Sequence, residues 1–343
     1  AAAVLGPVAL SVALDGRVWD LYPGWRVPDM PELTGKYAIV TGPTVNGIGF
    51  ESCVEMARKG ASVVLAGRSK SKGAEALRIL KERVPGATAE FMELDLASLK
   101  SVQQFALAYK KKQVPLHILM NSAGVMANPF SLTVDGLESQ FATNHLGHFL
   151  LTKLLLPVLE ESAPSRIVTV SSAAAFFPEM MKAAEVTGLV DAAPALDFDH
   201  LGADYEATYS PFKAYGRSKL ANVLFTQALD RRLKGKKVYA NVCHPGGIKT
   251  NLARHFMASE QFQSFGEKFV AFMQVFQEQM LLTPSQGAVT QLYLATAPEV
   301  EQKDIRGQYY RPQALSSNPP TASTEELQEK LWAISEKLVA DYL

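Results

Sequence analysis

The sequence predicts an α/β fold, a single doubly wound parallel-sheet domain, and three observations support this. Short apolar segments alternate with longer segments of helical periodicity from residue 36 to about residue 245. Most of the short segments contain a continuous apolar run, which is typical of parallel strands covered on both faces. A Gly-rich turn directly follows the first of them, and no linker interrupts the pattern. We therefore expect one large domain, although 343 residues would allow two.

The predicted strands and helices follow one another in strict alternation. Strands are expected at residues 36–41, 62–66, 89–94, 118–121, 166–171 and 238–243. Helices are expected at residues 51–58, 72–83, 102–111, 137–160 and 215–233. Right-handed crossovers between parallel strands place such helices on both faces of the sheet.

Both ends of the chain carry additions to this core. Residues 1–34 are interpreted as an N-terminal extension and residues 35–343 as the domain. The extension opens with an uncharged run, 1–14, shorter than the roughly 20 apolar residues of a transmembrane helix. It is interpreted as the remainder of a processed targeting segment, as a contact for a membrane or partner protein, or as a plain tail. The first two interpretations predict an organellar or membrane-associated protein, in a plastid, a mitochondrion or the endoplasmic reticulum. Near the C-terminus, a loop over 315–324 precedes an amphipathic helix over 325–343.

The composition excludes several classes of function. Lys and Arg number 34, and Asp and Glu also number 34, so the chain has no net charge. It therefore lacks the basic field that a general nucleic-acid binder needs. A hydrophobic content of 48% argues against disorder. The two cysteines, Cys53 and Cys243, are too few for a disulfide scaffold or a cysteine-rich zinc module.

The Gly-rich turn after the first strand predicts a phosphate-binding loop. It spans residues 41–49 and opens the first helix, whose N-terminal amides can hold a pyrophosphate. The alternative is a turn without a ligand. Gly67 and Arg68 follow the second strand, where NAD-binding sheets carry an acid for the ribose 2′-hydroxyl. Because an arginine fork binds a 2′-phosphate, Arg68 favours NADP(H) over NAD(H), unless it is only a solvated surface charge.

The order of the motifs resembles the short-chain dehydrogenase/reductase family, whose fold is of the Rossmann type. Seven motifs stand in the family's order at the ends of the predicted elements. They are the Gly loop at 41–49, Asp95-Leu96, Asn121-Ser122-Ala123-Gly124, Asn144 in NHLGHF, Ser171-Ser172, Tyr215 to Lys219, and His244-Pro245-Gly246. Within the family, NHLGHF, YGRSKLAN and HPGGIKT resemble the retinol dehydrogenase-like and WW-domain oxidoreductase-like branch.

Two features depart from the family pattern. The Gly loop has four residues between Gly42 and Gly47, where the family usually has three. The extra residue bulges outward harmlessly or disturbs the phosphate cradle. The stretch 173–214 between Ser172 and Tyr215 is longer than usual. We interpret it as an insertion at the rim of the active site, a substrate lip or a docking surface.

The resemblance implies the catalytic residues Asn144, Ser172, Tyr215 and Lys219. Tyr215 and Lys219 are four apart on a predicted helix and so share a face. A nearby ammonium is expected to lower the pKa of the phenol from about 10 toward neutrality. By resemblance, Ser172 polarises the substrate carbonyl, Lys219 also holds the nicotinamide ribose, and Asn144 holds a water in a proton relay. Ser171 and Ser172 point to opposite faces, and the family alignment favours Ser172.

The remaining expected site residues bind the cofactor, NADP(H). They are Gly42, Thr44, Asn46, Gly47, Ile48, Gly49, Arg68, Asp95, Leu96, Asn121, Ala123, Gly124, Pro245, Gly246 and Thr250. No metal site is expected. His145 and His148 are three apart on a predicted helix, but no acid or cysteine nearby completes a ligand set, so helix packing explains them better.

The segment 252–282 is expected to form the substrate lid, as it does in the family. Its phenylalanines at 265, 269, 272 and 276 fall on one helical face, which suits a lipophilic substrate, a membrane surface, a partner protein or simply the core. The main hypothesis is an NADP(H)-dependent oxidoreductase that interconverts a carbonyl and an alcohol on a retinoid-, steroid- or lipid-aldehyde-like substrate. The alternative is an accessory subunit of a larger, membrane-bound assembly with weak or no catalysis.

Overall fold

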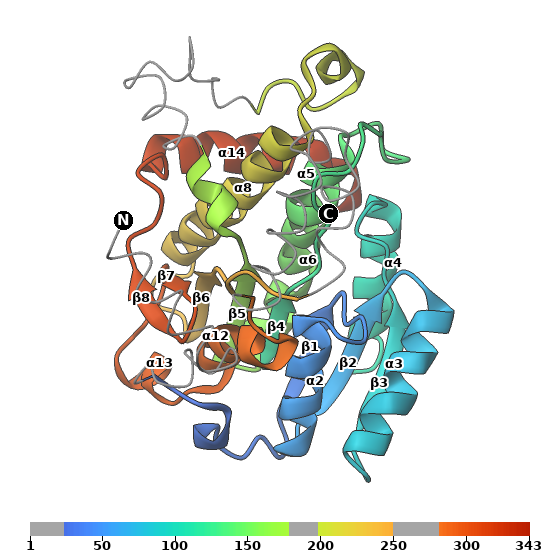
Figure 1. Ribbon diagram of the computed structural model, residues 1–343, viewed down its shortest axis with the longest axis vertical. Coiled ribbons are helices and arrows are strands. Elements are labelled where there is room, and N and C mark those ends of the chain that lie inside the picture. The colour runs from blue at the N-terminus through green and yellow to red at the C-terminus, as the bar shows by residue number, and fades with distance from the viewer. Residues whose placement is uncertain (1–23, 178–197, 250–280) are drawn as a thin grey trace, which may run out of the picture.

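The protein forms one eight-stranded sheet in the computed structural model, which describes residues 24–177, 198–249 and 281–343 (Figure 1). The strands lie in the order β3-β2-β1-β4-β5-β6-β7-β8, parallel except for the β7–β8 pair. Their bounds are β1 Tyr37–Thr41, β2 Ser62–Gly67, β3 Ala89–Glu93, β4 Ile118–Asn121, β5 Ser165–Val170, β6 Val238–Cys243, β7 Tyr309–Arg311 and β8 Leu315–Ser317. This confirms the doubly wound, Rossmann-type fold.

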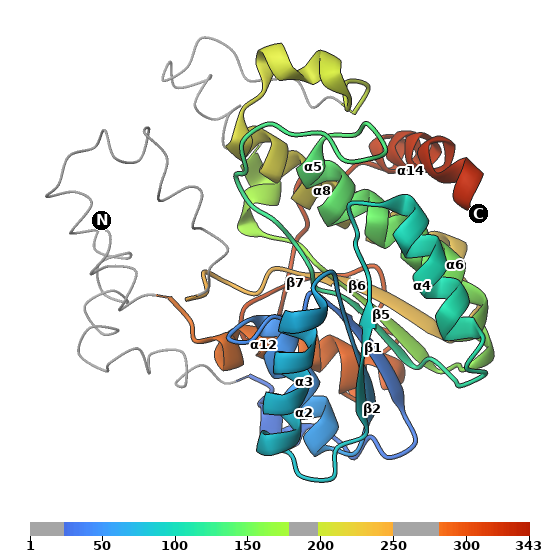
Figure 2. The same ribbon diagram turned by 90° about the vertical axis from the view of Figure 1, so that its right-hand side faces the viewer.

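Helices cover both faces of the sheet (Figure 2). Apolar side chains of α2, α3 and α12 pack on one face, and those of α4, α6 and α8 pack on the other, where α14 lies against α8. The bounds of the longer helices are α2 Ile48–Arg58, α3 Lys70–Arg83, α4 Leu99–Lys110, α6 Gly147–Glu161, α8 Pro211–Arg232, α12 Pro284–Thr296 and α14 Glu325–Val339. The short ones are α5 Ser139–Phe141 and α13 Glu299–Gln302, with η2 Val27–Asp29, η3 Ala142–Leu146, η4 Ala173–Phe176, η5 Ala203–Thr208 and η7 Ala340–Tyr342.

The six expected strands are present within one residue of their predicted bounds, whereas three expectations need correction. The helix expected over 137–160 is interrupted by a π-helical turn, η3. The C-terminal helix ends at Val339 and continues as the 3-10 turn η7. Residues 315–317, expected in a loop, form β8, because their backbone pairs with β7 at the edge of the sheet.

The strand order predicts a ligand crevice beside β1. Strand β2 lies on one side of β1 and β4 on the other, so the chain reverses its winding direction there. Ligands of doubly wound sheets bind outside the carboxyl ends of the strands at such a reversal. Residues 1–23, most of the expected lid and part of the insertion lie outside the described residues. Within the described part, no helix has the length and hydropathy of a membrane span.

Candidate active site

The carboxyl ends of β1 to β6 meet at one edge of the sheet, and the predicted site residues follow these strands. Gly42 follows β1, Arg68 follows β2, and Asp95 comes shortly after β3. Asn121 closes β4, Ser172 comes shortly after β5, and Pro245 shortly after β6. The structure therefore brings the sequence motifs to one edge, at the reversal between β1 and β4.

The Gly loop accommodates its extra residue in a tight turn. The Gly47 amide donates to the Thr44 carbonyl at 2.8 Å, and Asn46 between them has a φ of 64°. Asn tolerates this left-handed conformation at the third position of a turn. The N-terminus of α2 follows at once, and its N-cap residue Gly47 provides no side-chain hydrogen bond. The amides of this first turn can therefore face an anion, as the sequence predicts.

The loops after β1 and β4 touch each other and form the walls of the crevice. Gly42 has a φ of 67°, and a Cβ at this position would lie 2.8 Å from Ala123 Cα, so only glycine fits. Two buried polar atoms beside these loops, Asn121 Oδ1 and Ser122 Oγ, have no hydrogen-bond partner among the described residues. Buried polar atoms are normally paired, so the crevice has the bare backbone and the spare polar atoms that suit a bound dinucleotide.

Thr41, the last residue of β1, ties the first loop to the fourth strand through its hydroxyl. Thr41 Oγ1 accepts the Ser122 amide at 2.9 Å and the Ala123 amide at 3.0 Å. It also lies 2.8 Å from His148 Nε2, whose other ring nitrogen, Nδ1, lies 2.9 Å from the Asn144 carbonyl.

These contacts determine the tautomer of His148. A carbonyl can only accept, so Nδ1 carries the proton, and Thr41 donates to Nε2. Burial lowers the pKa of His148 to about 4, which leaves the ring neutral at pH 7. His148 therefore packs within the helix as expected, and it also forms hydrogen bonds with Thr41 and the Asn144 carbonyl. The other ring, His145, makes a 2.9 Å contact with Ser335 through Nε2.

Asn144 lies in the π-helical turn η3, a distortion that occurs frequently at functional sites. Its Oδ1 accepts the Val125 amide at 2.8 Å, and its Nδ2 donates to the Val125 carbonyl at 2.9 Å. Nδ2 also donates to Ser218 Oγ at 2.9 Å, and that hydroxyl donates to the Tyr215 carbonyl at 2.8 Å. Asn144 thus joins the loop after β4 to the helix that carries Tyr215 and Lys219.

Ser172, Tyr215 and Lys219 form one cluster beside the end of β5. Tyr215 and Lys219 are buried on α8, and the Ser172 hydroxyl lies near enough to the Tyr215 phenol to lower its pKa. Ser171 instead donates to the Lys219 carbonyl at 2.7 Å. The structure therefore places the second serine, and not the first, against the phenol.

Lys219 is held in the cluster by a backbone contact and a close glycine. Its Nζ donates to the Val170 carbonyl at 3.1 Å and lies 5.8 Å from the centre of the Tyr215 ring. A Cβ at Gly124 would lie 3.2 Å from Nζ, so the glycine keeps open the space beside the ammonium.

The pKa values of Tyr215 and Lys219 differ from those expected from the sequence. Burial raises the pKa of Tyr215 to about 12, and the nearby Ser172 hydroxyl only opposes this rise. Burial also lowers the pKa of Lys219 to about 8. The ammonium was expected to bring the phenol toward neutrality, but in this structure removal from water dominates both groups. Lys219 is still mostly protonated at pH 7.

The remaining predicted residues lie along the same edge. Arg68 is exposed after β2, and its side chain makes no ion pair or hydrogen bond with any described residue. Asp95 Oδ1 accepts the Ala97 amide at 3.0 Å, a strand-end cap, and the buried Leu96 packs its carbonyl against Gly147. Pro245 is buried, and Gly246 takes a φ of 100°. Thr250 and lid residues 252–280 lie outside the described part of the chain.

Known proteins are similar to this chain in sequence and in fold. A family model described as short chain dehydrogenase matches residues 36–184. The human WW domain-containing oxidoreductase is 40% identical over 91% of this chain and 70% of its own length. Human retinol dehydrogenase 14 is 37% identical over 98% of both chains.

The chain belongs to the short-chain dehydrogenase family. As a member of this family, it is an oxidoreductase. Further comparisons with known proteins agree with this assignment. Human polyprenol dehydrogenase is 37% identical over 91% of this chain and 87% of its own length. A crystal structure of an uncharacterized protein from Mycobacterium paratuberculosis superposes with a TM-score of 0.67 at 32% identity, over 92% of this chain and 98% of that one. A Shigella flexneri short chain dehydrogenase complexed with NADP shares the fold, with a TM-score of 0.58 at 21% identity over 82% of this chain and 98% of that one.

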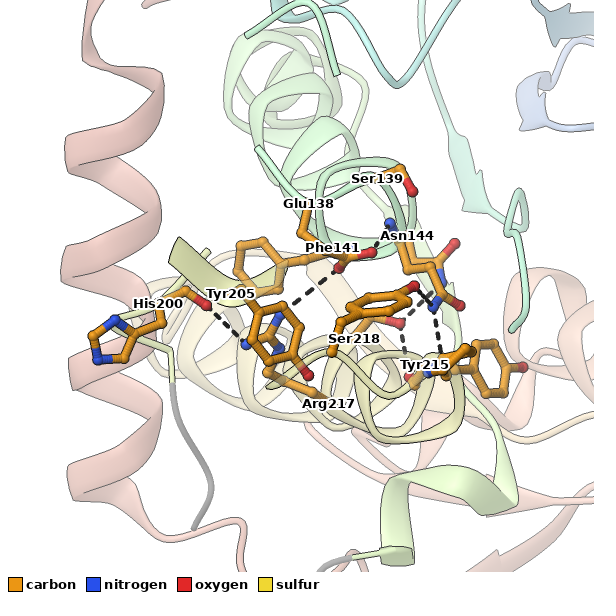
Figure 3. Close-up of polar contacts among 12 residues, drawn as sticks. Glu138, Ser139, Phe141, Asn144, His200, Tyr205, Tyr215, Arg217 and Ser218 are labelled. Carbon is orange, nitrogen blue, oxygen red and sulfur yellow. Dashed lines mark hydrogen bonds and ion pairs between the residues drawn. The ribbon is translucent and has the colours of Figure 1, made fainter. Parts of the chain in front are cut away.

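This short-chain dehydrogenase also contains a buried ion pair that the sequence motifs did not indicate. Glu138 accepts the amides of Gln140 and Phe141, which cap the start of α5, and Arg217 Nη2 lies 3.7 Å from its Oε2 (Figure 3). Arg217 also donates to the His200 carbonyl at 3.0 Å and lies over the Tyr205 ring at 4.3 Å.

Arg217 therefore connects α8 both to the helix start that precedes Asn144 and to the described part of the 173–214 stretch, which contains His200 and Tyr205. The sequence contained one signal for this ion pair, because Arg217 lies inside the Tyr-x-x-x-Lys motif. A charged residue at such a buried position needs a partner of opposite charge. Ser218 and Thr41 lie inside predicted motifs, but their roles were not predicted, because short hydroxyl side chains carry little pattern information.

Proposed function

We propose that this dehydrogenase uses NADP(H) to interconvert a carbonyl and an alcohol on a lipophilic substrate. The observation that carries the proposal is the cluster of the half-buried Ser172 with the buried Tyr215 and Lys219 at the carboxyl edge of the sheet. A phenol, a hydroxyl and an ammonium gathered in one cluster provide a proton donor and a polarising group for one carbonyl oxygen. An accessory subunit without catalysis would not need this cluster.

The crevice residues fit a dinucleotide. The turn over 44–47 and the amides at the start of α2 would hold the pyrophosphate, and Gly42 and Gly124 keep the walls bare. Arg68, exposed at the end of β2, would bind a 2′-phosphate, which supports NADP(H) over NAD(H). When bound, the nicotinamide supplies or accepts the hydride.

The chain's own residues handle the proton. During reduction, Tyr215 Oη would give its proton to the substrate oxygen, and Ser172 would donate a hydrogen bond to that oxygen. The Lys219 ammonium, whose pKa of about 8 keeps it mostly charged at pH 7, would stabilise the phenolate that remains. Val170 and Asn144 hold Lys219 and the backbone of Tyr215 in place for this step.

A lipophilic substrate is supported by the relatives and by the lid sequence. The names of two relatives refer to retinol and polyprenol, both apolar alcohols. The phenylalanine-rich segment 252–282 would contribute an apolar wall. Contact of residues 1–14 and of the lid with a membrane, and an organellar location, remain predictions from the sequence.

An assay of NADPH oxidation tests the proposed chemistry. Retinoid, steroid and long-chain aliphatic carbonyls are offered in turn, and turnover is followed by loss of NADPH absorbance. We expect turnover on at least one apolar carbonyl and a loss of at least a hundredfold in Tyr215→Phe, which removes the proton donor. Tight NADPH binding without turnover on any substrate would refute the enzymatic proposal, and equal activity of Tyr215→Phe would refute the assigned acid.

Cofactor preference is tested separately by direct binding of NADPH and NADH. We expect NADPH to bind more tightly, and Arg68→Glu to reverse this preference by placing a carboxylate where the 2′-phosphate would lie. Lys81→Met, an exposed substitution near the end of α3, is the matched control. Tighter binding of NADH by the unaltered protein contradicts the role given to Arg68.

A further inference from the structure

A second concave site lies at the opposite edge of the sheet, near the amino ends of β1, β4 and β5. The cavity has a volume of about 240 Å³. Its walls come from the connector before β1, the first residues of β4 and β5, and the corner between α12 and α13. Apolar side chains, among them Leu33, Ile118 and Pro298, line much of it.

Only some of the hydrogen-bond donors of the buried arginine in this cavity have a partner. Arg166 is 4% exposed. Its Nη2 donates to Glu301 at 2.7 Å and to the Ala297 carbonyl at 3.3 Å. Its Nη1 is buried and has no hydrogen-bond partner among the described residues. A buried donor without an acceptor costs free energy, and the guanidinium is otherwise contacted by the Tyr239 ring, whose centre lies 5.2 Å away.

Two more donors line the same cavity. His117 Nδ1 accepts the Tyr37 amide at 3.1 Å, so in the neutral ring the proton lies on Nε2, which is a donor. Burial and the nearby Lys36 charge lower the pKa of His117, which keeps the ring neutral. The Lys36 ammonium makes no ion pair or hydrogen bond with any residue that the structure describes.

The acids of the cavity do not balance these donors. Glu301 is already paired with Arg166, and Glu32 lies 3.4 Å from Lys59, which is not part of the lining. The charge of Lys36 is therefore left over beside the buried Arg166 guanidinium, in a pocket that is lined partly by apolar residues. A charged oxygen acceptor would form charge-assisted hydrogen bonds with both.

We propose that this cavity is a binding site for a small organic carboxylate, with Arg166, Lys36 and His117 facing its oxygens and the apolar walls holding its body. The volume is below the 300–1,000 Å³ that is usual for drug-sized ligands, so the ligand has a compact body, such as one ring. The site is at the amino edge, away from the cofactor crevice at the carboxyl edge. Its occupancy is independent of the cofactor.

Benzoate is the probe for this site. The complete protein is titrated with sodium benzoate by calorimetry at pH 7 in a buffer without phosphate or carboxylate, with and without saturating NADPH. We expect one benzoate per chain with the same affinity in both conditions, and no binding of the neutral analogue benzamide. Arg166→Met and Lys36→Met are each expected to weaken benzoate binding by about tenfold or more, because each removes a charged donor.

The control is Lys234→Met, an exposed lysine before β6 that does not line the cavity; it should bind benzoate like the unaltered protein. If Arg166→Met does not fold, Lys36→Met decides, because Lys36 is only half-buried. Absence of benzoate binding, equal binding of benzamide, loss of binding with NADPH, or unchanged binding by Lys36→Met would each overturn the proposal.

Discussion

Replacement of Lys219 with methionine should stabilise the protein at neutral pH while it removes the catalytic ammonium. The Lys219 side chain is buried, and methionine has a similar length without the charge. A buried ammonium is kept only at a cost in folding free energy, because water solvates it better in the unfolded chain. The variant removes that cost.

The magnitude follows from the change in pKa between the two states. Burial lowers the pKa of Lys219 from 10.5 to about 8, and each unit corresponds to about 1.4 kcal/mol, so the cost at pH 7 is about 3 kcal/mol. The substitution also removes the hydrogen bond from Nζ to the Val170 carbonyl, worth about 1 kcal/mol. That carbonyl keeps its bond from Asn222 Nδ2 at 3.1 Å. The expected net stabilisation is about 2 kcal/mol.

The pH dependence of the stabilisation shows whether the buried charge of Lys219 causes it. Between pH 8 and 10.5 the unfolded lysine still holds its proton while the folded one has lost it, so the stability of the unaltered protein rises with pH in this window. The advantage of Lys219→Met should therefore be greatest below pH 8 and disappear as the pH approaches 10.5. Urea unfolding of the cofactor-free protein, repeated across this range, measures it.

The matched control is Lys213→Met, an exposed lysine on the same helix. It should leave the stability unchanged at every pH, because the Lys213 side chain remains in water. The reasoning is refuted if Lys219→Met is no more stable than the unaltered protein at pH 7, or if its advantage is the same at pH 7 and pH 10.5.

The remaining predictions concern the neighbours of Lys219 and its proton. Thr41→Val leaves the two amides after β4 and the His148 ring without their partner, so the free energy of unfolding in urea should fall by about 2 kcal/mol or more. Thr41→Ser keeps the hydroxyl and should keep most of the stability. Equal losses in the two variants would contradict this network. Gly124→Val places a branched side chain where a Cβ alone would lie 3.2 Å from Lys219 Nζ, so turnover should fall at least tenfold while far-ultraviolet circular dichroism stays unchanged. For carbonyl reduction, kcat/KM of the unaltered enzyme should fall as the pH rises through about 8, where Lys219 loses its proton; a flat profile up to pH 10 would show that this ammonium is not required.

Most of the strands were predictable because parallel strands buried on both faces carry a nearly continuous apolar signal. β4, for example, reads Ile-Leu-Met-Asn and is buried throughout. The pair β7–β8 gave no such signal, because each strand has three residues and is defined by its backbone partners at the sheet edge. Helix α12 did have a readable start, since Thr283 and Gln286 form a capping box.

The catalytic motifs were predictable because spacing along a helix fixes which side chains share a face. Tyr215 and Lys219 therefore lie together as expected. The π-helical turn at Asn144 was not predictable, since a shift of one backbone hydrogen bond leaves no trace in apolar periodicity. The raised pKa of Tyr215 was also missed, because the degree of burial, which decides it, depends on the whole fold.

The anchoring of Lys219 to the Val170 carbonyl also bears on the kinetics of ligand binding. A free lysine side chain has up to about 2 kcal/mol of rotamer entropy to lose when a ligand immobilises it. Here Val170 at the end of β5 immobilises it when the chain folds. A cofactor that enters the crevice therefore meets an ammonium already in position, and the association step does not have to wait for a rare side-chain conformer.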